Sequence, residues 1–309
     1  MGRQLEETER LSALRKEASM SFSDAHFKEK LSEQLPGSLT SLRKVGGGDI
    51  NLAYKATVSN GRHYFIKTHP APPPHFFTEE ARGLSLLAQT NTVGIPHVIA
   101  VVETTELSCL ILEWVDVGQQ TSQTSHTFGR ELALLHRSSS EEFGLNASNY
   151  IGTLEQSNQP TETWHEFYRD YRLAPLLERA HRSGVLPSML FNQSHRLLNE
   201  LVDLAGPAEK PSLLHGDLWG GNRLVDRHGK SWLVDPAVYF GHREVDLAMM
   251  RLFGGFNEAV FSAYNETFPL SSGWQERIPL YQLYPMLVHL NLFGGNYLSS
   301  VEQIIRRYT

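Results

Sequence analysis

The sequence is poor in cysteine and contains no long apolar run. Its 309 residues include one cysteine, Cys109, which excludes an intramolecular disulfide and a multi-cysteine metal site. No apolar stretch approaches the ~20 residues that a membrane-spanning helix needs. The first residues, MGRQLEETERLSALRKE, are charged and lack the apolar core of a signal peptide. These absences predict a cytoplasmic protein with a buried, structural thiol.

Positive charge is not in excess either. The chain has 28 Lys and Arg against 34 Asp and Glu, a formal charge of −6 at pH 7. This balance gives no electrostatic reason to expect a nucleic acid or an anionic membrane as partner. A phosphate compound can still be bound by loop amides and a few cations. With 40% hydrophobic and 20% charged residues the composition is that of a globular protein, and the length favours two lobes.

Most strand-like segments lie in the first part of the chain. We expect polar helices at residues 4–18 and 23–35 and a further helix at 77–89. Asn60-Gly61 is a strong hairpin signal between two strands. The expected strands are 39–45, 52–58, 62–68, 97–103 and 107–114.

A polar stretch, VDVGQQTSQTS at residues 115–125, separates this part from a helical remainder. Strand-like pieces return only around 213–235. The expected helices are 126–138, 161–182, 188–205, 244–265 and 274–305. The sequence therefore predicts an α+β, protein-kinase-like fold with two lobes. A small β-rich lobe with a five-stranded sheet covers 1–114, a hinge or linker covers 115–125, and a larger helical lobe covers 126–309.

The stretch LLHGDLWGGN carries the strongest chemical signal. Phosphoryl transfer from ATP needs a loop over the phosphates, a cation, oxygen ligands for Mg²⁺ and a group that orients the attacking hydroxyl. His215, Asp217 and Asn222 have the H-x-D-x-x-x-x-N spacing of a protein-kinase catalytic loop. Asp235 ends the apolar run SWLV, where that template places a metal-binding acid.

The small lobe offers the remaining parts of such a site. YFIK places Lys67 on the third expected strand. Glu79 or Glu80 on the following helix can pair with it, and the helix phase alone does not separate the two. The run between the first two strands consists of Gly46, Gly47 and Gly48. Taken singly, each part also fits a turn, a solvated side chain or a strand end, but their joint order and spacing favour a kinase site.

The sequence departs from protein kinases at two places. In the glycine loop Asn51 stands where the third glycine is expected, and Asn tolerates the left-handed conformation that Gly would adopt. Asp49 in that loop would repel phosphates unless it points away or helps to bind Mg²⁺. After Asp235, DPAVYFGHREVDLAMM contains no Ser or Thr and no A-P-E follows. A small-molecule acceptor is therefore favoured over a docked polypeptide.

Three blocks closely resemble the fructosamine kinase (ketosamine-3-kinase) family, a branch of the aminoglycoside phosphotransferase-like kinases. They are LLHGDLWGGN, WLVDPAVYFGHREVDLAM and NLFGGNYLSS, and the resemblance runs from about residue 20 to the C-terminus. It implies ATP- and Mg²⁺-dependent phosphorylation of a hydroxyl on a ketose attached to an amine. That is a repair reaction on small ketosamines or on glycated amines, including protein lysines.

The resemblance also implies roles for residues of this chain. Asp217 is the catalytic base, Asn222 and Asp235 are Mg²⁺ ligands, and Lys67 pairs with Glu80, which aligns better with the family than Glu79 does. The segment expected to form the hinge beside adenine consists of Glu113, Trp114 and Val115.

Three further residues are expected to support the site. By the same resemblance, Asp246 fixes the backbone of the catalytic loop. Trp219 could stack on the sugar or face the amine cation, or it could anchor the loop in the core. His215 is interpreted as a residue that fixes the loop, because Asp217 already supplies the base. His242, Arg243 and Glu244 are interpreted as a helix cap.

Two other functions fit the same residues. Within the fold, an aminoglycoside, choline or homoserine kinase is the alternative, although DPAVYFGHRE argues against it. A nucleotide-binding pseudokinase scaffold is disfavoured because Lys67, Asp217, Asn222 and Asp235 are all present. These residues do not decide which molecule is the phosphoryl acceptor.

Overall fold

The computed structural model describes residues 25–46, 51–105 and 107–309. The helix expected at 4–18, the first residues of the one expected at 23–35, and Gly47, Gly48 and Asp49 lie outside the described residues. The chain divides into two compact units. One consists of Met1–Arg82 and Pro96–Val115, and the other of Gly83–Ile95 and Asp116–Thr309. The lobe boundaries expected near 114 and 125 stay a prediction.

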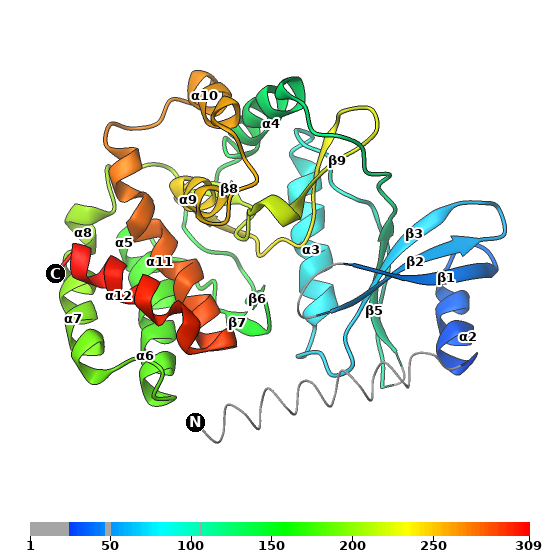
Figure 1. The fold of residues 1–309 in the computed structure, drawn as a ribbon, viewed down its shortest axis with the longest axis horizontal. Coiled ribbons are helices and arrows are strands. Elements are labelled where there is room, and N and C mark those ends of the chain that lie inside the picture. The colour runs from blue at the N-terminus through cyan, green and yellow to red at the C-terminus, as the bar shows by residue number, and fades with distance from the viewer. Residues whose placement is uncertain (1–24, 47–50, 106) are drawn as a thin grey trace. The chain divides into compact units, whose positions relative to one another are not determined.

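The first unit is built on a five-stranded antiparallel sheet with the order β1-β2-β3-β5-β4 (Figure 1). The turn between β2 and β3 places Gly61 at φ +82°, a conformation that favours glycine. All five strands were predicted to within two residues. They are β1 (Leu39–Val45), β2 (Leu52–Val58), β3 (His63–Thr68), β4 (Val98–Glu103) and β5 (Ser108–Glu113).

Helix α2 (Ala25–Gln34) and this sheet share one hydrophobic core. Phe27 and Leu31 of the helix are buried with Ile66 and Ile111 of the sheet, and each such side chain contributes about 1.5–3 kcal/mol of transfer free energy. Cys109 is fully buried in the same core, and burial raises the pKa of its thiol to about 12. The thiol is therefore structural.

Helix α3 (Phe76–Gln89) follows the proline-rich loop. Its first turn is capped by Glu103 of β4, which accepts hydrogen bonds from the Phe77 amide at 2.9 Å and the Thr78 hydroxyl at 2.7 Å. A carboxylate at a helix N-terminus also interacts favourably with the helix dipole. The residues of α3 up to Arg82 belong to the first unit.

The second unit is helical, but its long predicted helices are broken into shorter ones. The segment expected at 161–182 contains a π-helical turn, η1, between two α-helices. The segment expected at 244–265 breaks at Gly254 and Gly255, and the one at 274–305 breaks at Gly294, all three with positive φ. Apolar periodicity continued across these glycines, so it did not reveal the breaks. The resulting elements are α5 (Trp164–Tyr168), η1 (Arg169–Leu173), α6 (Ala174–Arg182), α7 (Ser188–Asn199), α8 (Leu201–Leu204), α9 (Glu244–Leu252), α10 (Glu258–Thr267), α11 (Trp274–Phe293), η3 (Gly295–Tyr297) and α12 (Leu298–Arg307).

The first helix of this unit, α4 (Ser122–Leu135), begins inside the stretch that was predicted to be a connector. Thr121 and Thr124 form a reciprocal capping box. The Thr124 amide donates to the Thr121 hydroxyl at 3.2 Å, and the Thr121 amide donates to the Thr124 hydroxyl at 2.9 Å. Such a pair satisfies two backbone donors and starts the helix. The polar composition that suggested a linker is that of a helix cap.

Short strands complete the second unit. The pieces LLH, RLVD and SWLVD correspond to β8 (Ser212–Leu214), β9 (Arg223–Val225) and β10 (Ser231–Leu233), and β9 and β10 form a hairpin. Three further strands of three residues each were not predicted. They are β6 (Asn149–Ile151), β7 (Leu154–Gln156) and β11 (Tyr239–Gly241), of which β6 pairs with β7 and β11 with β8.

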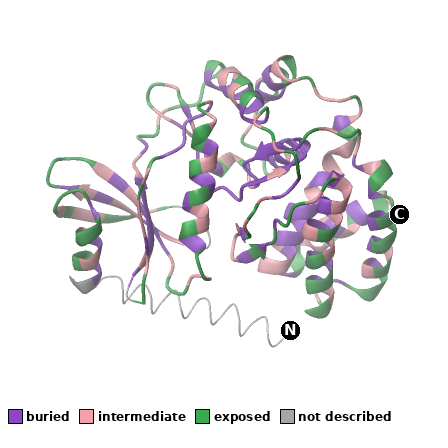
Figure 2. Ribbon diagram, turned by 180° about the vertical axis from the view of Figure 1, so that it is seen from behind, coloured by how far each residue is buried: buried purple, intermediate pink, exposed green. Residues whose placement is uncertain are grey.

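Helix α11 runs through the core of this unit, and Leu280, Leu283 and Leu287 are fully buried. In Figure 2, the helices of the second unit carry buried residues on the sides that face one another and exposed residues on their outer sides. Among the described residues no helix has the length and hydropathy of a membrane span.

Candidate active site

The segment 215–222 forms a tight loop after β8. The Asn222 amide Nδ2 donates to the backbone oxygen of Asp217 at 2.8 Å and to its carboxylate Oδ2 at 3.2 Å. The short 3₁₀ turn η2 (Gly220–Asn222) brings the two side chains together. The spacing noted in the sequence is therefore a direct contact in the structure.

His215 fixes this loop from inside. Its ring is fully buried, with Nε2 2.9 Å from the Val234 oxygen and Nδ1 3.3 Å from the Asp217 amide. A neutral ring that donates from Nε2 and accepts at Nδ1 satisfies both contacts. Burial lowers the pKa of His215, although the charge of Asp246 and the Val234 bond oppose this. The ring is thus a neutral support for the loop.

The Asp235 segment is locked against the same loop. Asp235 has φ +56°, an uncommon value for a residue other than glycine that persists only where the surroundings impose it. The Val234 amide donates to the Asn222 oxygen at 3.1 Å, and the Ala237 amide donates to the His215 oxygen at 2.9 Å. Gly216, at φ +82°, lies so close to the Ala237 oxygen that a Cβ there would overlap it.

Asp246 of helix α9 holds the loop backbone by its amides. Its buried carboxylate accepts from the His215 amide at 2.7 Å and from the Gly216 amide at 2.9 Å. Burial alone would raise the pKa of Asp246, but the hydrogen bond and charge of His136 and the amide bonds hold it below its usual range. The carboxylate is therefore ionised and accepts from both loop amides.

His136 extends this network and was not identified from the sequence. The His136 ring is buried, with Nε2 3.2 Å from Asp246 Oδ2 and Nδ1 2.8 Å from the hydroxyl of Tyr264 on α10. The only local signal is a lone histidine at the end of the apolar run LALL. Nothing in its sequence neighbourhood reveals a partner 110 residues away.

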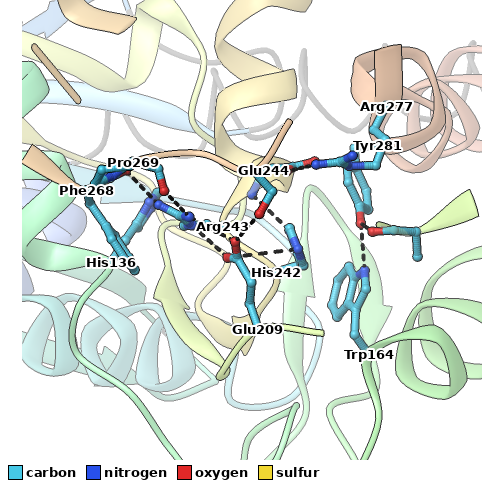
Figure 3. Close-up of polar contacts among 12 residues, drawn as sticks. His136, Trp164, Glu209, His242, Arg243, Glu244, Phe268, Pro269, Arg277 and Tyr281 are labelled. Carbon is cyan, nitrogen blue, oxygen red and sulfur yellow. Dashed lines mark hydrogen bonds and ion pairs between the residues drawn. The ribbon is translucent and has the colours of Figure 1, made fainter. Parts of the chain in front are cut away.

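The start of helix α9 is anchored by buried ion pairs (Figure 3). Arg243 makes two bonds to the Glu209 carboxylate, at 2.7 and 2.9 Å, and donates to the Phe268 and Pro269 oxygens. Glu244 accepts two bonds from Arg277 of α11. His242 does cap α9, since its Nδ1 accepts from the Glu244 amide at 3.3 Å. Arg243 and Glu244 in addition join α9, which carries Asp246, to neighbouring segments.

Lys67 and Glu80 form an ion pair within the first unit. The Lys67 ammonium lies 2.9 and 2.8 Å from the two Glu80 oxygens, and both side chains are largely buried. Glu79 instead lies 3.8 Å from Arg82. Glu80 is therefore the partner of Lys67. A lysine held on a rigid strand by a carboxylate is pre-positioned for an anion such as phosphate.

The residues expected to form the hinge end strand β5 and follow it. Glu113 pairs with Tyr64 in the sheet, Val115 is buried, and the Lys55 ammonium lies 4.3 Å from the centre of the Trp114 ring. Gly46 is the described residue of the glycine run, and a Cβ there would meet no atom within 4 Å. The nucleotide-binding roles of these residues stay predictions.

Trp219 is on the surface of the second unit. Its side chain is 40% exposed, and the indole lies over Gly221, where a Cβ would overlap it. Its ring also meets the exposed ring of Phe253 edge-on at 6.5 Å. The indole is therefore partly exposed, and it lies two residues along the chain from Asp217.

The donor set of the second unit fits a magnesium ion. Mg²⁺ prefers oxygen ligands and in kinases takes one or two protein groups plus phosphates. Asp235 offers a carboxylate and Asn222 an amide oxygen; the Nδ2 of Asn222 is engaged with Asp217, and in the described part of the chain its Oδ1 accepts no hydrogen bond. Within that part no group of three or more His, Cys, Asp or Glu side chains could hold a metal ion.

Comparison with known proteins identifies the family. The family model described as fructosamine kinase matches residues 23–309. The chain belongs to the fructosamine kinase family. A "probable ketoamine kinase" of Enterococcus faecium is 37% identical over 265 residues, which cover 85% of this chain and 94% of that protein. A chloroplastic protein-ribulosamine 3-kinase of Arabidopsis thaliana is 36% identical over 282 residues, covering 90% and 85%.

Solved structures confirm the predicted fold class. A "putative fructosamine-3-kinase" from Thermobifida fusca superposes with a TM-score of 0.83 at 35% identity, covering 90% of this chain and 96% of that one. An amicoumacin kinase in complex with AMP-PNP superposes at 0.63 with 12% identity, covering 95% of each chain, and shares the fold. The chain is an α+β kinase of this family.

Proposed function

We propose that this chain transfers the γ-phosphoryl group of ATP, with Mg²⁺, to a sugar hydroxyl of a ketosamine. The acceptor class is that of its relatives, which are named ketoamine and ribulosamine kinases. The observation that supports the proposal most is the contact between Asp217 and Asn222 in a loop tied to Asp235. Phosphorylation of ketoses on small amines or protein lysines would be a repair step on glycated amines.

In this proposal Asp217 orients the acceptor hydroxyl and accepts its proton as the oxygen attacks the γ-phosphorus. The bond between that phosphorus and the oxygen of the leaving ADP breaks in the same step. Asn222 steadies the Asp217 carboxylate through its 3.2 Å hydrogen bond. A carboxylate within hydrogen-bonding reach of the hydroxyl serves as a general base, which contributes about 10²–10⁴ in rate.

Asn222 and Asp235 would hold Mg²⁺, which when bound neutralises phosphate charge. Lys67 would bind the α- and β-phosphates, and its pair with Glu80 keeps the ammonium on the strand when no nucleotide is bound. The acid and the amide belong to one unit and the lysine to the other.

Trp219 is proposed to recognise the acceptor. A ketosamine joins a polyhydroxylated chain to an amine that is largely protonated near neutral pH. The exposed indole offers a face to that cation, an interaction of about 0.5–2 kcal/mol. Free fructose lacks the cation and should be a poor substrate.

The test is Asp217→Asn, which removes the base and keeps the shape of the side chain. Phosphorylation of a fructosamine should fall by about 10²–10⁴-fold, while calorimetry should find Mg·ATP affinity nearly unchanged. Asp203→Asn, on an exposed position of α8, is the control and should keep full activity. Near-normal turnover by folded Asp217→Asn would reject the assignment of the base.

A further inference from the structure

Arg172 is a buried cation beneath the candidate active site. It lies in the π-helical turn η1 and is fully buried. In the described part of the chain no carboxylate forms an ion pair with its guanidinium, which donates to the Ser157 and Tyr171 oxygens at 2.7 and 2.9 Å and to the Asn158 side chain. The guanidinium also lies 3.9 Å from the centre of the Tyr239 ring.

Such a group is costly to keep in a core. Carbonyl oxygens and aromatic faces compensate only part of the desolvation of a cation that lacks a counter-ion. The Arg172 Nε and the Tyr239 hydroxyl are both buried and make no hydrogen bond of standard geometry within the described residues, although the Arg172 charge still acts on the Tyr239 phenol and opposes the rise of its pKa by burial. π-helical turns and costly buried charges both concentrate at functional sites. The buried Arg172 guanidinium is therefore expected to have a functional role in addition to packing.

A continuous set of hydrogen bonds runs from Arg172 to the Asp235 segment. Asn158, bonded to Arg172, donates to the Asn149 Oδ1 at 2.8 Å, and Asn149 donates to the Val238 oxygen at 2.8 Å. Gln156 donates to the same Asn149 oxygen at 2.8 Å and to the Ala237 oxygen at 3.1 Å. All of these side chains are buried, and they come from the hairpin β6–β7 and the residues just after it.

One of the two carbonyls held in this way, that of Ala237, lies against the catalytic loop. Ala237 donates its amide to the His215 oxygen, and its own oxygen packs against Gly216. Ala237 and Val238 both lie within three residues of Asp235. The left-handed backbone of Asp235 persists only where the surrounding structure imposes it. The hairpin therefore fixes the segment that carries the metal-binding acid against the loop that carries the base.

Tyr284 of helix α11 closes the network. Its hydroxyl donates to Gln156 Oε1 at 2.6 Å. Burial raises the pKa of Tyr284, with Arg172 opposing the rise and Asp217 adding to it. Its phenol therefore stays a neutral donor, and the charges of Arg172 and Asp217 both reach it.

We propose that Arg172, Gln156 and Tyr284 are positioning residues for phosphoryl transfer, acting through the 235–238 segment on the geometry of Asp217 and Asp235. The inference rests on the proposed function. Arg172 supplies the planar fork that orders Ser157 and Asn158, Gln156 holds the Ala237 oxygen, and Tyr284 orients Gln156. All three side chains are buried, and they are proposed to act through the 235–238 segment alone.

The test compares two tyrosines of the same core. Tyr284→Phe removes the hydroxyl that orients Gln156, and Tyr168→Phe removes a buried hydroxyl that donates to the backbone oxygen of Leu280 instead of to Gln156. Residues that orient metal ligands typically change activity or metal affinity about 10–100-fold. Tyr284→Phe should therefore lower kcat and raise the Mg²⁺ concentration for half-saturation each by roughly 10-fold. The KM for the acceptor and the melting temperature should match those of Tyr168→Phe.

Arg172→Met and Arg172→Lys test whether the Arg172 guanidinium is needed to order this set of hydrogen bonds. Lysine keeps the charge but lacks the fork, so Arg172→Lys should lose kcat as Arg172→Met does. Wild-type kcat and Mg²⁺ dependence in Tyr284→Phe, or equal losses in Tyr168→Phe, would overturn the proposal, as would full activity of Arg172→Lys.

Mg²⁺-dependent ATP binding, measured by calorimetry without an acceptor, separates this inference from the proposed function. If the acceptor assignment is wrong, the difference between Tyr284→Phe and Tyr168→Phe should persist in that measurement. A wild-type chain that bound no nucleotide would overturn both.

Discussion

Replacing Asp246 with asparagine tests how the catalytic loop is held. The carboxylate accepts from two backbone amides and from His136, and it is almost completely buried. Asparagine keeps one oxygen and turns an NH₂ group toward one of these donors. Hydrogen bonds to a charged acceptor contribute about 1.5–3 kcal/mol, and a buried donor left unsatisfied costs about 1–3 kcal/mol. We expect Asp246→Asn to lower the free energy of unfolding by about 3 kcal/mol.

The loss should appear in both stability and catalysis. A change of 3 kcal/mol corresponds to a fall of roughly 6–12 °C in Tm for a chain of this size. kcat should also fall, because the Gly216 amide beside Asp217 loses its acceptor. Asp203→Asn on the surface is the control for both assays.

The pH dependence gives the sign of the effect. The pKa of Asp246 is lowered in the folded chain, so its stabilisation is complete above the unfolded value of about 3.9 and disappears as the pH falls through the lower folded value. The difference between wild type and Asp246→Asn, followed by denaturant unfolding, should therefore shrink below about pH 4. Equal stability and equal kcat at pH 7 would refute the role given to this carboxylate.

Four other changes follow from the same contacts. Lys67→Ala should lower kcat/KM for ATP and remove the cation that lies 2.8–2.9 Å from the buried Glu80 carboxylate, which thermal melting would detect as a loss of stability. Asp235→Ala should abolish Mg²⁺-dependent nucleotide binding in calorimetry, and unchanged affinity would place the metal elsewhere. Trp219→Ala should raise the KM for amine-linked ketoses more than that for ATP, and a change in Tm alone would contradict this. Because burial lowers the pKa of His215, its contribution to stability is lost as the pH falls below the ordinary histidine value of about 6.5. The Tm of the wild type should thus decrease more between pH 7 and pH 5 than the Tm of His215→Gln does.

Residues close in sequence carried most of the predictive information. Asp217 and Asn222 share one loop, and Lys67 follows the apolar run Tyr64–Ile66 after a hairpin signal, so local pattern and spacing placed them in the correct elements. The strands of the first unit were also predicted well, since each is six or seven residues long. Local patterns of this length carry a readable period.

The supporting contacts could not be predicted because they join distant segments. Tyr264 lies 128 residues from His136, and Tyr284 lies 128 residues from Gln156. A buried glutamine in a three-residue strand has no periodic signature, and the π-helical turn that carries Arg172 follows the same apolar period as an α-helix. Only the fold reveals which polar residues meet.

The most direct test of the central claim is a comparison of acceptors with the purified chain. Initial rates of ADP release at saturating Mg·ATP would be measured against a fructosamine, a ribulosamine, free fructose, choline and an aminoglycoside, with Asp217→Asn as the control. The account predicts that one or both ketosamines have the highest kcat/KM, that free fructose is poor, and that Asp217→Asn removes the turnover. Equal kcat/KM for free fructose and its amine conjugate, or a preference for choline or the aminoglycoside, would contradict it.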